Sequence, residues 1–388
     1  MRPAGGAVAQ KTAAQAAGRA GAGSVALTES HLIVGIGELL WDILPGGQPA
    51  GGISSGGSSP TEPFGGVPLQ GGSQRALLGG APANFAVLAG RLGNRAAILS
   101  RVGCDELGRL AVDSLDPLPV DTRFLQVDPA HETGRVTVSF AGDEPRYTIH
   151  QPAAWDFLDL SSEWLQLAEQ ADAICFGSLA QRSPDSRQTI QSLAAQTPAS
   201  CIRVFDVNLR PPFYPREVIR ESLDLATVVK MNEEEAPQVL ALLGLPVDWE
   251  PSADRAEQPE TDPRPSVNDL RKSAERLLDA FPALQMAAIT RGRSGSLLVT
   301  REEWNEHPGF PVKAADRIGA GDAFTAAMTD YMLRGADLAT LNEAGNRWGG
   351  WVASQPGAMP ALPDAVRDAR PARCRARCHC RGHRRIGF

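Results

Sequence analysis

The chain has 388 residues, a hydrophobic fraction of 43% and a formal net charge of −7 at pH 7. This length and apolar fraction are typical of an α/β protein with a sizeable core, and the acidic balance gives no general reason to expect nucleic acid as a partner. Every apolar run is shorter than the roughly 18 residues that a membrane span needs, so we expect no membrane partner.

The two ends differ in composition from the rest of the chain. Residues 1–30 are rich in Ala and Gly and lack the continuous apolar stretch of a secretory signal. Residues 366–388 are basic and rich in Arg and Cys, with a cysteine spacing that matches no common zinc pattern. We expect both ends to be disordered, and metal or nucleic-acid binding by the tail is the alternative.

Three other cysteines lie in mostly apolar segments: Cys104, Cys175 and Cys201. Six cysteines in a chain of this length make no disulfide framework, so we expect these three to be reduced thiols in or near the core. The expected compartment is therefore the cytoplasm, and organelle targeting by residues 1–30 is the alternative.

The first predicted strand covers residues 32–42, a continuous apolar run typical of a strand that is buried on both faces. Asp42 closes this strand, where polar groups of α/β proteins often meet a ligand; a turn aspartate is the alternative. Residues 45–78 are rich in Gly, Ser and Pro and have no hydrophobic period. They predict a loop insertion that adds nothing to the core.

Gly79 and Gly80 follow this insertion and permit a close approach of the backbone. Residues 83–92 then predict a helix of small residues, with Gly93 at its C-cap. Asn84 lies in the first turn of this helix. Its amide either faces a ligand hydroxyl or caps the helix.

The remainder predicts an α/β fold with a central, mostly parallel sheet flanked by helices. Residues 134–150 alternate with period two around a turn and predict a β-hairpin outside the main sheet, usable as a flap over a site. Strands alternate with helices after it, and residues 247–266 predict a second surface insertion. The predicted strands lie at 171–178, 202–210 and 227–232, and residues 286–299 predict a strand, a Gly turn and a second strand.

The stretch 316–324 runs from a polar loop into an Ala-rich helical pattern. Gly319, Ala320 and Gly321 leave N–H groups uncovered where the helix dipole is positive, which suits a phosphate or an oxyanion. A phosphate would repel Asp322, so we interpret Asp322 as a base for an incoming hydroxyl. An ordinary capped helix N-terminus is the alternative for this stretch taken alone.

Taken together, these stretches resemble the ribokinase-like PfkB carbohydrate kinase family, and within it the fructokinases. The resemblance rests on segments 38–42, 79–84 with Gly93, 152–156, 205–210, 232–235 and 316–322. It spans residues 32–363, and separated motifs in the right order are far more specific than any one of them. It implies a ribokinase-like three-layer fold over residues 31–365, with the 134–150 hairpin as part of a small β lid.

The resemblance also implies a reaction and its residues. The reaction is ATP-dependent phosphorylation of a free sugar, most similar to the conversion of D-fructose to fructose 6-phosphate. Asp322 would be the base, and the anion hole would be Gly319, Ala320 and Gly321. Sugar hydroxyls would meet Asp42, Gly79, Gly80, Asn84 and, from the lid, Arg146. The nucleotide would lie against Asn232, Thr290, Gly292 and Asn346. Glu235 would hold Mg²⁺ through water, and Asp316 would lie at a site for a monovalent cation such as K⁺.

Other interpretations remain open from the sequence. The sugar is ribose or 2-keto-3-deoxygluconate in one alternative, and the chain is a catalytically silent sugar- or nucleotide-binding regulator in another. The presence of Asp322 and of the Gly-Ala-Gly turn argues against a silent regulator. Arg317 departs from the family, in which many members carry Thr. A homodimer formed through the lid is the expected partner arrangement.

Overall fold

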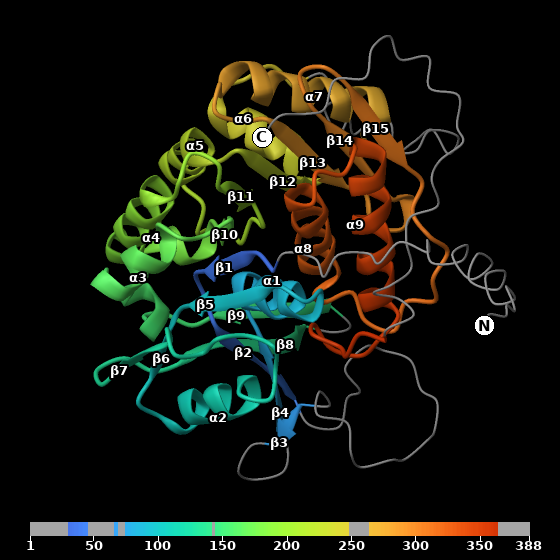
Figure 1. Cartoon of the computed structure of the whole chain (residues 1–388). Helices are drawn as coiled ribbons and strands as arrows, with labels where there is room; N and C mark the ends of the chain where they lie inside the picture. The colour runs from blue at the N-terminus through green and yellow to red at the C-terminus, as the bar shows by residue number, and fades with distance from the viewer. Residues whose placement is uncertain (1–29, 46–65, 69–73, 142–143, 248–263, 364–388) are drawn as a thin grey trace, which may run out of the picture. The chain divides into compact units, whose positions relative to one another are not determined.

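The main sheet of the protein has eight strands in the order β15-β14-β13-β12-β11-β10-β1-β5 (Figure 1). The structure is a computed structural model, and it describes residues 30–45, 66–68, 74–141, 144–247 and 264–363. Six neighbouring strands of this sheet pair in parallel, namely β13, β12, β11, β10, β1 and β5. The last two strands, β14 and β15, are antiparallel. The bounds are β1 Leu32–Ile36, β5 Arg95–Leu99, β10 Ala173–Gly177, β11 Ile202–Asp206, β12 Val228–Asn232, β13 Met286–Thr290, β14 Ser296–Val299 and β15 Trp304–His307.

Helices cover both faces of this sheet, as its apolar parallel strands require. One face packs against α3 (Ser162–Ala168), α4 (Pro184–Gln196), α5 (Arg216–Leu225), α6 (Glu235–Leu243) and α7 (Val267–Ala280). The other packs against α1 (Ala81–Arg91), α8 (Ala320–Leu333) and α9 (Leu338–Ala353). The predicted α/β fold is therefore confirmed. Among the described residues, no helix has both the length and the apolar character that crossing a membrane would take.

A second sheet of five strands has the order β3-β4-β2-β8-β9 (Figure 1). The hairpin predicted over 134–150 is present as its strands β8 (Gly134–Ala141) and β9 (Glu144–Ile149). Its other strands are β2 (Leu40–Pro45), β3 (Val67–Pro68) and β4 (Gln74–Gly79). We call this sheet the lid. A third, two-stranded sheet pairs β6 (Arg101–Gly103) with β7 (Gln126–Asp128), beside α2 (Glu106–Leu115).

The single strand predicted over 32–42 is wrong. β1 ends at Ile36, and Gly37 with φ 146° turns the chain out of the main sheet, so that β2 belongs to the lid. The continuous apolar run hid this break because both halves are buried. The prediction that all of 45–78 is an insertion outside the core is also wrong, since Gln74–Gly79 forms β4 and buries Ala76 against β2.

The remaining sequence predictions concern the three cysteines, the two chain ends and the two insertions. Cys175 and Cys201 are buried free thiols as expected, but Cys104 is exposed, so its prediction as a core or near-core thiol is wrong. It follows β6 at the start of the turn into α2, where the apolar strand has already ended. The predictions for the two chain ends and for most of the two insertions fall on 1–29, 46–65, 69–73, 248–263 and 364–388, outside the described residues.

Helix α1 approaches a neighbouring loop so closely that one glycine leaves no room for a side chain. A Cβ atom on Gly90 would lie 1.7 Å from the carbonyl oxygen of Pro119, which is backbone and cannot rotate away. We expect Gly90→Ala to lower the free energy of unfolding by about 1–3 kcal/mol, as overpacked cores do. Urea unfolding measures this, with Gly177→Ala as control, where the nearest atom would be 3.4 Å away. Equal stability of the two variants would contradict the expectation.

Candidate active site

The first turn of α8 offers N–H groups to an anion. Gly319 precedes the helix with φ 78°, and a Cβ atom there would lie 2.4 Å from the carbonyl oxygen of Ala358. Only glycine fits both the left-handed conformation and the close packing. The first N–H groups of an α-helix have no intrahelical acceptor and lie at the positive end of its dipole. Gly319, Ala320 and Gly321 therefore form a turn that can receive a negatively charged oxygen.

Asp322 lies in this turn and has the properties of a general base. Asn84 donates a hydrogen bond from Nδ2 to its Oδ2 at 2.8 Å. Burial, followed by the negative charge of Asp206, raises the pKa of Asp322 to about 6, although Lys230, Asn84 and Arg210 oppose the rise. A carboxylate with such a pKa is largely ionised at neutral pH and accepts a proton more readily than an ordinary aspartate.

A buried ion pair lies beside the same turn. The Lys230 ammonium is 3.1 Å from each carboxylate oxygen of Asp206, and both side chains are more than nine-tenths buried. Burial lowers the pKa of Lys230, but the negative charges of Asp206, Glu235 and Asp322 outweigh it and hold this pKa above its ordinary value. The Nζ atom lies only 3.0 Å from where a Cβ on Gly321 would be. A permanent positive charge therefore adjoins the anion-binding turn.

Glu235 joins the ends of β11 and β12. Its Oε1 accepts the N–H of Leu209 at 2.9 Å, and its Oε2 accepts the N–H of Asn232 at 2.8 Å. The Asn232 side chain in turn accepts the N–H groups of Glu234 and Glu235 at the start of α6. The hydrogen bonds to Glu235 therefore fix the loop after β11 to the end of β12. Asn208 in this loop has φ 38°.

The donor set near Glu235 fits a magnesium ion that keeps most of its waters. Within the described residues, no three His, Cys, Asp or Glu side chains are grouped as a metal cage. Mg²⁺ binds through one or two carboxylates plus substrate phosphates and needs no such cage. Glu235 is 6% exposed and already accepts two backbone N–H groups, so its remaining lone pairs suit water-mediated contact. The magnesium role of Glu235 stays a prediction.

The predicted sugar-binding residues lie where the lid joins the main sheet. A Cβ atom on Gly80, with φ 115°, would lie 2.3 Å from the carbonyl oxygen of Glu38, which accounts for the predicted close approach. Asp42 lies on β2 opposite Leu77 of β4, and its Oδ2 would lie 3.3 Å from a Cβ on Gly79. Burial raises the pKa of Asp42 to about 6, with Arg210 opposing the rise and Asp316 adding to it.

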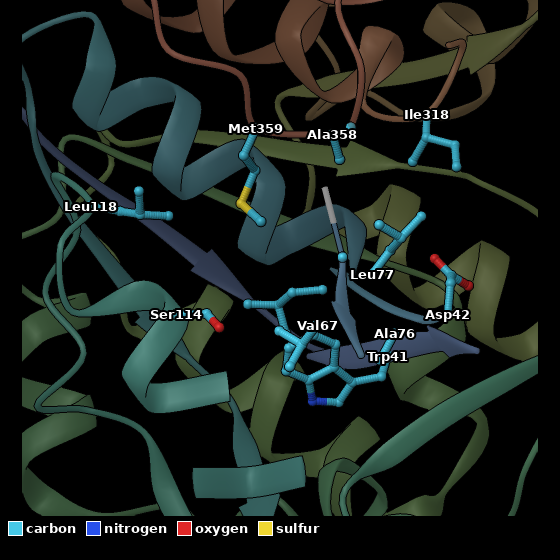
Figure 2. Close-up of a pocket in the computed structure, with 13 residues that line it drawn as sticks. Trp41, Asp42, Val67, Ala76, Leu77, Ser114, Leu118, Ile318, Ala358 and Met359 are labelled. Atoms are coloured by element: carbon cyan, nitrogen blue, oxygen red, sulfur yellow. The ribbon is translucent and has the colours of Figure 1, made fainter. Parts of the chain in front are cut away.

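Figure 2 shows a pocket beside Asp42, between the lid and the loops near α8. Its wall is mostly apolar, and the Asp42 carboxylate lies at its edge near Ile318 and Leu77. Asp316 links two loops of the pocket wall, because its carboxylate accepts the N–H groups of Ile318 at 3.0 Å and Gly357 at 3.4 Å. The side chains that line the pocket are therefore apolar except for the Asp42 carboxylate and the Ser114 hydroxyl. Its further lining residues are Trp41, Gly66, Val67, Ala76, Leu78, Ser114, Leu118, Gly357, Ala358 and Met359.

The predicted nucleotide residues fall into two places. Asn232 and Thr290 are register partners at the ends of β12 and β13, and Gly292 follows with φ 54°. Asn346 lies on α9, where its amide donates to Ser296 Oγ at 2.6 Å and to Asn342 O at 2.7 Å in a buried network. The side chain of Arg146 falls outside the described part of β9. The nucleotide and lid roles of these residues stay predictions.

Four charged residues at this site were absent from the sequence-based set: Glu38, Asp206, Lys230 and Arg210. Three of them had a usable signal, because Glu38 belongs to the 38–42 string and Asp206 and Arg210 belong to the 205–210 string, both of which resemble fructokinases. Arg210 opposes the raised pKa values of Glu38, Asp42 and Asp322 and is the cation shared by all three. Lys230 precedes Asn232 by two residues, but no pattern in the sequence predicts that its ammonium lies beside Gly321.

Comparisons with known proteins agree with this geometry. Residues 59–365 match the model of the family described as pfkB family carbohydrate kinase. The putative sugar kinase PH1459 of Pyrococcus horikoshii is 30% identical over 274 residues, which cover 69% of this chain and 77% of that protein. The probable fructokinase-6, chloroplastic, of Arabidopsis thaliana is 29% identical over 369 residues, 91% and 85% of the two chains.

A solved structure is similar over nearly the whole fold. It is a double mutant of fructokinase from Vibrio cholerae O395, bound to fructose, ADP and potassium ion. The TM-score is 0.65 at 25% sequence identity, and the match covers 88% of this chain and 98% of the other.

Proposed function

Because the chain belongs to the pfkB family of carbohydrate kinases and is therefore a sugar kinase, we propose that it transfers the γ-phosphoryl group of ATP to D-fructose, giving fructose 6-phosphate and ADP. The choice of fructose is supported by the fructokinases among its relatives. The observation that carries the proposal is the Asp322 carboxylate, which stands in the anion-binding turn beside Asn84 and Lys230. A silent regulator would not need a base and a cationic turn in one place.

The proposed transfer uses the site in a definite way. The sugar O6 attacks the γ-phosphorus in line as the bond to the β,γ-bridging oxygen breaks, and Asp322 takes the proton that O6 loses. The N–H groups of Gly319, Ala320 and Gly321 face the equatorial oxygens of the phosphoryl group in transit. Lys230 adds its positive charge on the side of Gly321. Phosphoryl transfer needs positioning and charge neutralisation more than covalent help, and these groups supply both.

Metal ions enter the proposal through two sets of residues. Glu235 and the ends of β11 and β12 would order the waters of a magnesium ion, which supplies charge neutralisation at the phosphates when bound. Asp316 and the loop near Gly357 would lie at a site for K⁺. The relative from Vibrio cholerae was solved with a potassium ion, which supports the choice of that cation. Turnover measured in K⁺ and in choline chloride at equal ionic strength tests this part, and equal rates would remove Asp316 from the proposal.

The other proposed properties concern substrate entry, assembly and location. Asp42, Gly79, Gly80 and Asn84 would bind sugar hydroxyls, and Arg146 would reach them from the lid. Tyr147 on the lid strand β9 is 67% exposed, which supports a dimer through this sheet. We propose the cytoplasm as the compartment. The alternative is an organelle, to which residues 1–30 would target the protein. The Arabidopsis relative that is named chloroplastic supports this alternative.

A coupled assay of ADP release over a sugar panel tests the function directly. The panel holds fructose, ribose, 2-keto-3-deoxygluconate, adenosine and a control without sugar. We expect the highest kcat/KM with fructose, and analysis of the product by ³¹P NMR should place the phosphate on O6. A higher kcat/KM for ribose or for 2-keto-3-deoxygluconate would replace fructose as the substrate. ADP release that is independent of every sugar would overturn the proposal.

A further inference from the structure

A second carboxyl group lies close to the proposed base and has no place in the reaction described so far. Glu38 occupies the short link between β1 and β2, where the chain passes from the main sheet to the lid. Only 3% of this residue is exposed. Its backbone packs against the start of α1, because a Cβ atom on Gly80, the N-cap of that helix, would lie 2.3 Å from the Glu38 carbonyl oxygen. The backbone N–H groups of Glu38 and Ala81 favour the charged form of its carboxyl and so lower its pKa. Glu38 therefore lies beside the start of the helix that carries Asn84.

One oxygen of this carboxyl has no hydrogen-bond partner within the described residues. Glu38 Oε2 is buried and makes no hydrogen bond within the described residues, and the same is true of Asn84 Oδ1. Two acceptors without donors therefore lie at the N-terminal end of one helix. Ala81 and Asn84 are three residues apart on α1 and therefore share a face of the helix. Because helical side chains lean toward the N-terminus, the Asn84 amide is directed toward the end of α1 beside which Glu38 lies.

A single proton would satisfy both acceptors. On Oε2 it turns that atom into a donor, and Asn84 Oδ1 is an acceptor in need of one. The charges that face Glu38 agree with such a proton. Burial raises the pKa of Glu38 to about 7, helped by Asp322 on α8 and opposed by the two backbone N–H groups and by Arg210 after β11. Burial likewise raises the pKa of Asp322, to about 6, but Lys230, Asn84 and Arg210 favour its charged form.

We propose that Glu38 is a positioning residue of the phosphoryl transfer, which acts as a neutral acid by holding the Asn84 amide that in turn holds Asp322. The inference rests on the proposed function, because it gives Glu38 a role only if Asp322 is the base. The chain of contacts runs from Glu38 Oε2–H to Asn84 Oδ1, and from Asn84 Nδ2–H to Asp322 Oδ2. The second of these bonds is 2.8 Å long. When Glu38 loses its proton, the first bond is lost and a second negative charge appears beside the base.

Three substitutions separate this role from a structural one. Glu38→Gln keeps the shape and an N–H donor without the charge, so we expect kcat to stay within about threefold of the wild type. Glu38→Ala and Glu38→Asp cannot reach Asn84, and we expect each to lower kcat by about tenfold or more while KM for ATP is unchanged. Glu163→Gln, in the exposed first turn of α3, is the matched control and should change nothing. A Glu38→Gln enzyme as slow as Glu38→Ala would overturn the proposal, as would wild-type kcat in Glu38→Ala.

Infrared spectroscopy of the enzyme without substrates tests the proton itself. Between about pH 6 and about pH 7 we expect a C=O stretch of a protonated carboxylic acid that disappears in Glu38→Gln and shifts in Asn84→Ala. A wild-type spectrum that Glu38→Gln leaves unchanged would overturn the proposal even where the Ala variant does not fold. Since this readout needs no sugar, it is independent of the sugar panel. Failure of the wild type to phosphorylate any sugar would instead count against the proposed function.

Discussion

Replacing Asp322 with asparagine is expected to lower kcat for sugar phosphorylation by about 10²–10⁴-fold, the usual contribution of a general base. This corresponds to about 3–5 kcal/mol of lost transition-state stabilisation. Asparagine keeps the size of the side chain and an oxygen for the Asn84 bond of 2.8 Å, so the turn should retain its shape. The affinity for ATP should therefore change little, which isothermal titration calorimetry measures alongside steady-state kinetics.

The pH dependence of the wild type is an independent measurement of the same base. The pKa of Asp322 is raised to about 6, and the base works only when ionised. As the pH falls through this value the carboxylate takes a proton, so kcat/KM should fall tenfold per pH unit below it. Above about pH 7 the ionisation of Glu38 should lower kcat/KM again. Asp113→Asn, on the exposed side of α2, should keep both kcat and this profile. Asp322→Asn with more than half of the wild-type kcat would remove Asp322 from the role of base.

The sequence predicted the fold wherever periodicity and burial agree. Parallel strands such as β10 (Ala173–Gly177) are buried on both faces, and their continuous apolar runs indicate this. The same criterion failed over 32–42, because β1 and β2 are both buried although they belong to different sheets. An apolar run in the sequence predicts that a segment is buried, but it does not predict to which sheet the segment belongs. Gly37, with φ 146°, was the local sign of the break.

The site was predictable in the parts that use local motifs. The turn at Gly319 and the neighbouring Asp322 are contiguous in sequence, and the structure adds Asn84 as a direct partner of Asp322 from 238 residues away. Lys230 was not predictable in this way, and Glu38 had only its place in the 38–42 string. Neither a lysine in an apolar strand nor a glutamate after a glycine has a spacing rule that points to a distant helix turn. Their proximity to Asp322 arises from the parallel order of the strands, which brings the ends of β1, β11 and β12 to one edge.

Lys230→Met is the second substitution for which we expect a large effect, and it should act on both turnover and stability. Loss of the positive charge beside Gly321 should lower kcat by about 10²–10³-fold, as loss of one preorganised charge-stabilising donor does. It also leaves Asp206 buried without the ammonium that now lies 3.1 Å from both of its oxygens. Breaking a buried pair from one side typically lowers the free energy of unfolding by about 3–5 kcal/mol.

A double-mutant cycle with Asp206→Asn separates the two effects of Lys230. Asparagine removes the unpaired charge, so the double variant should recover most of the lost stability in urea unfolding. It should not recover kcat, because the charge next to the anion-binding turn is still missing. Recovery of both quantities would mean that Lys230 serves only to neutralise Asp206. Recovery of stability alone would mean that the Lys230 ammonium stabilises the phosphoryl group during its transfer. This role fits its position, because a Cβ atom on Gly321 would lie 3.0 Å from the Lys230 Nζ atom.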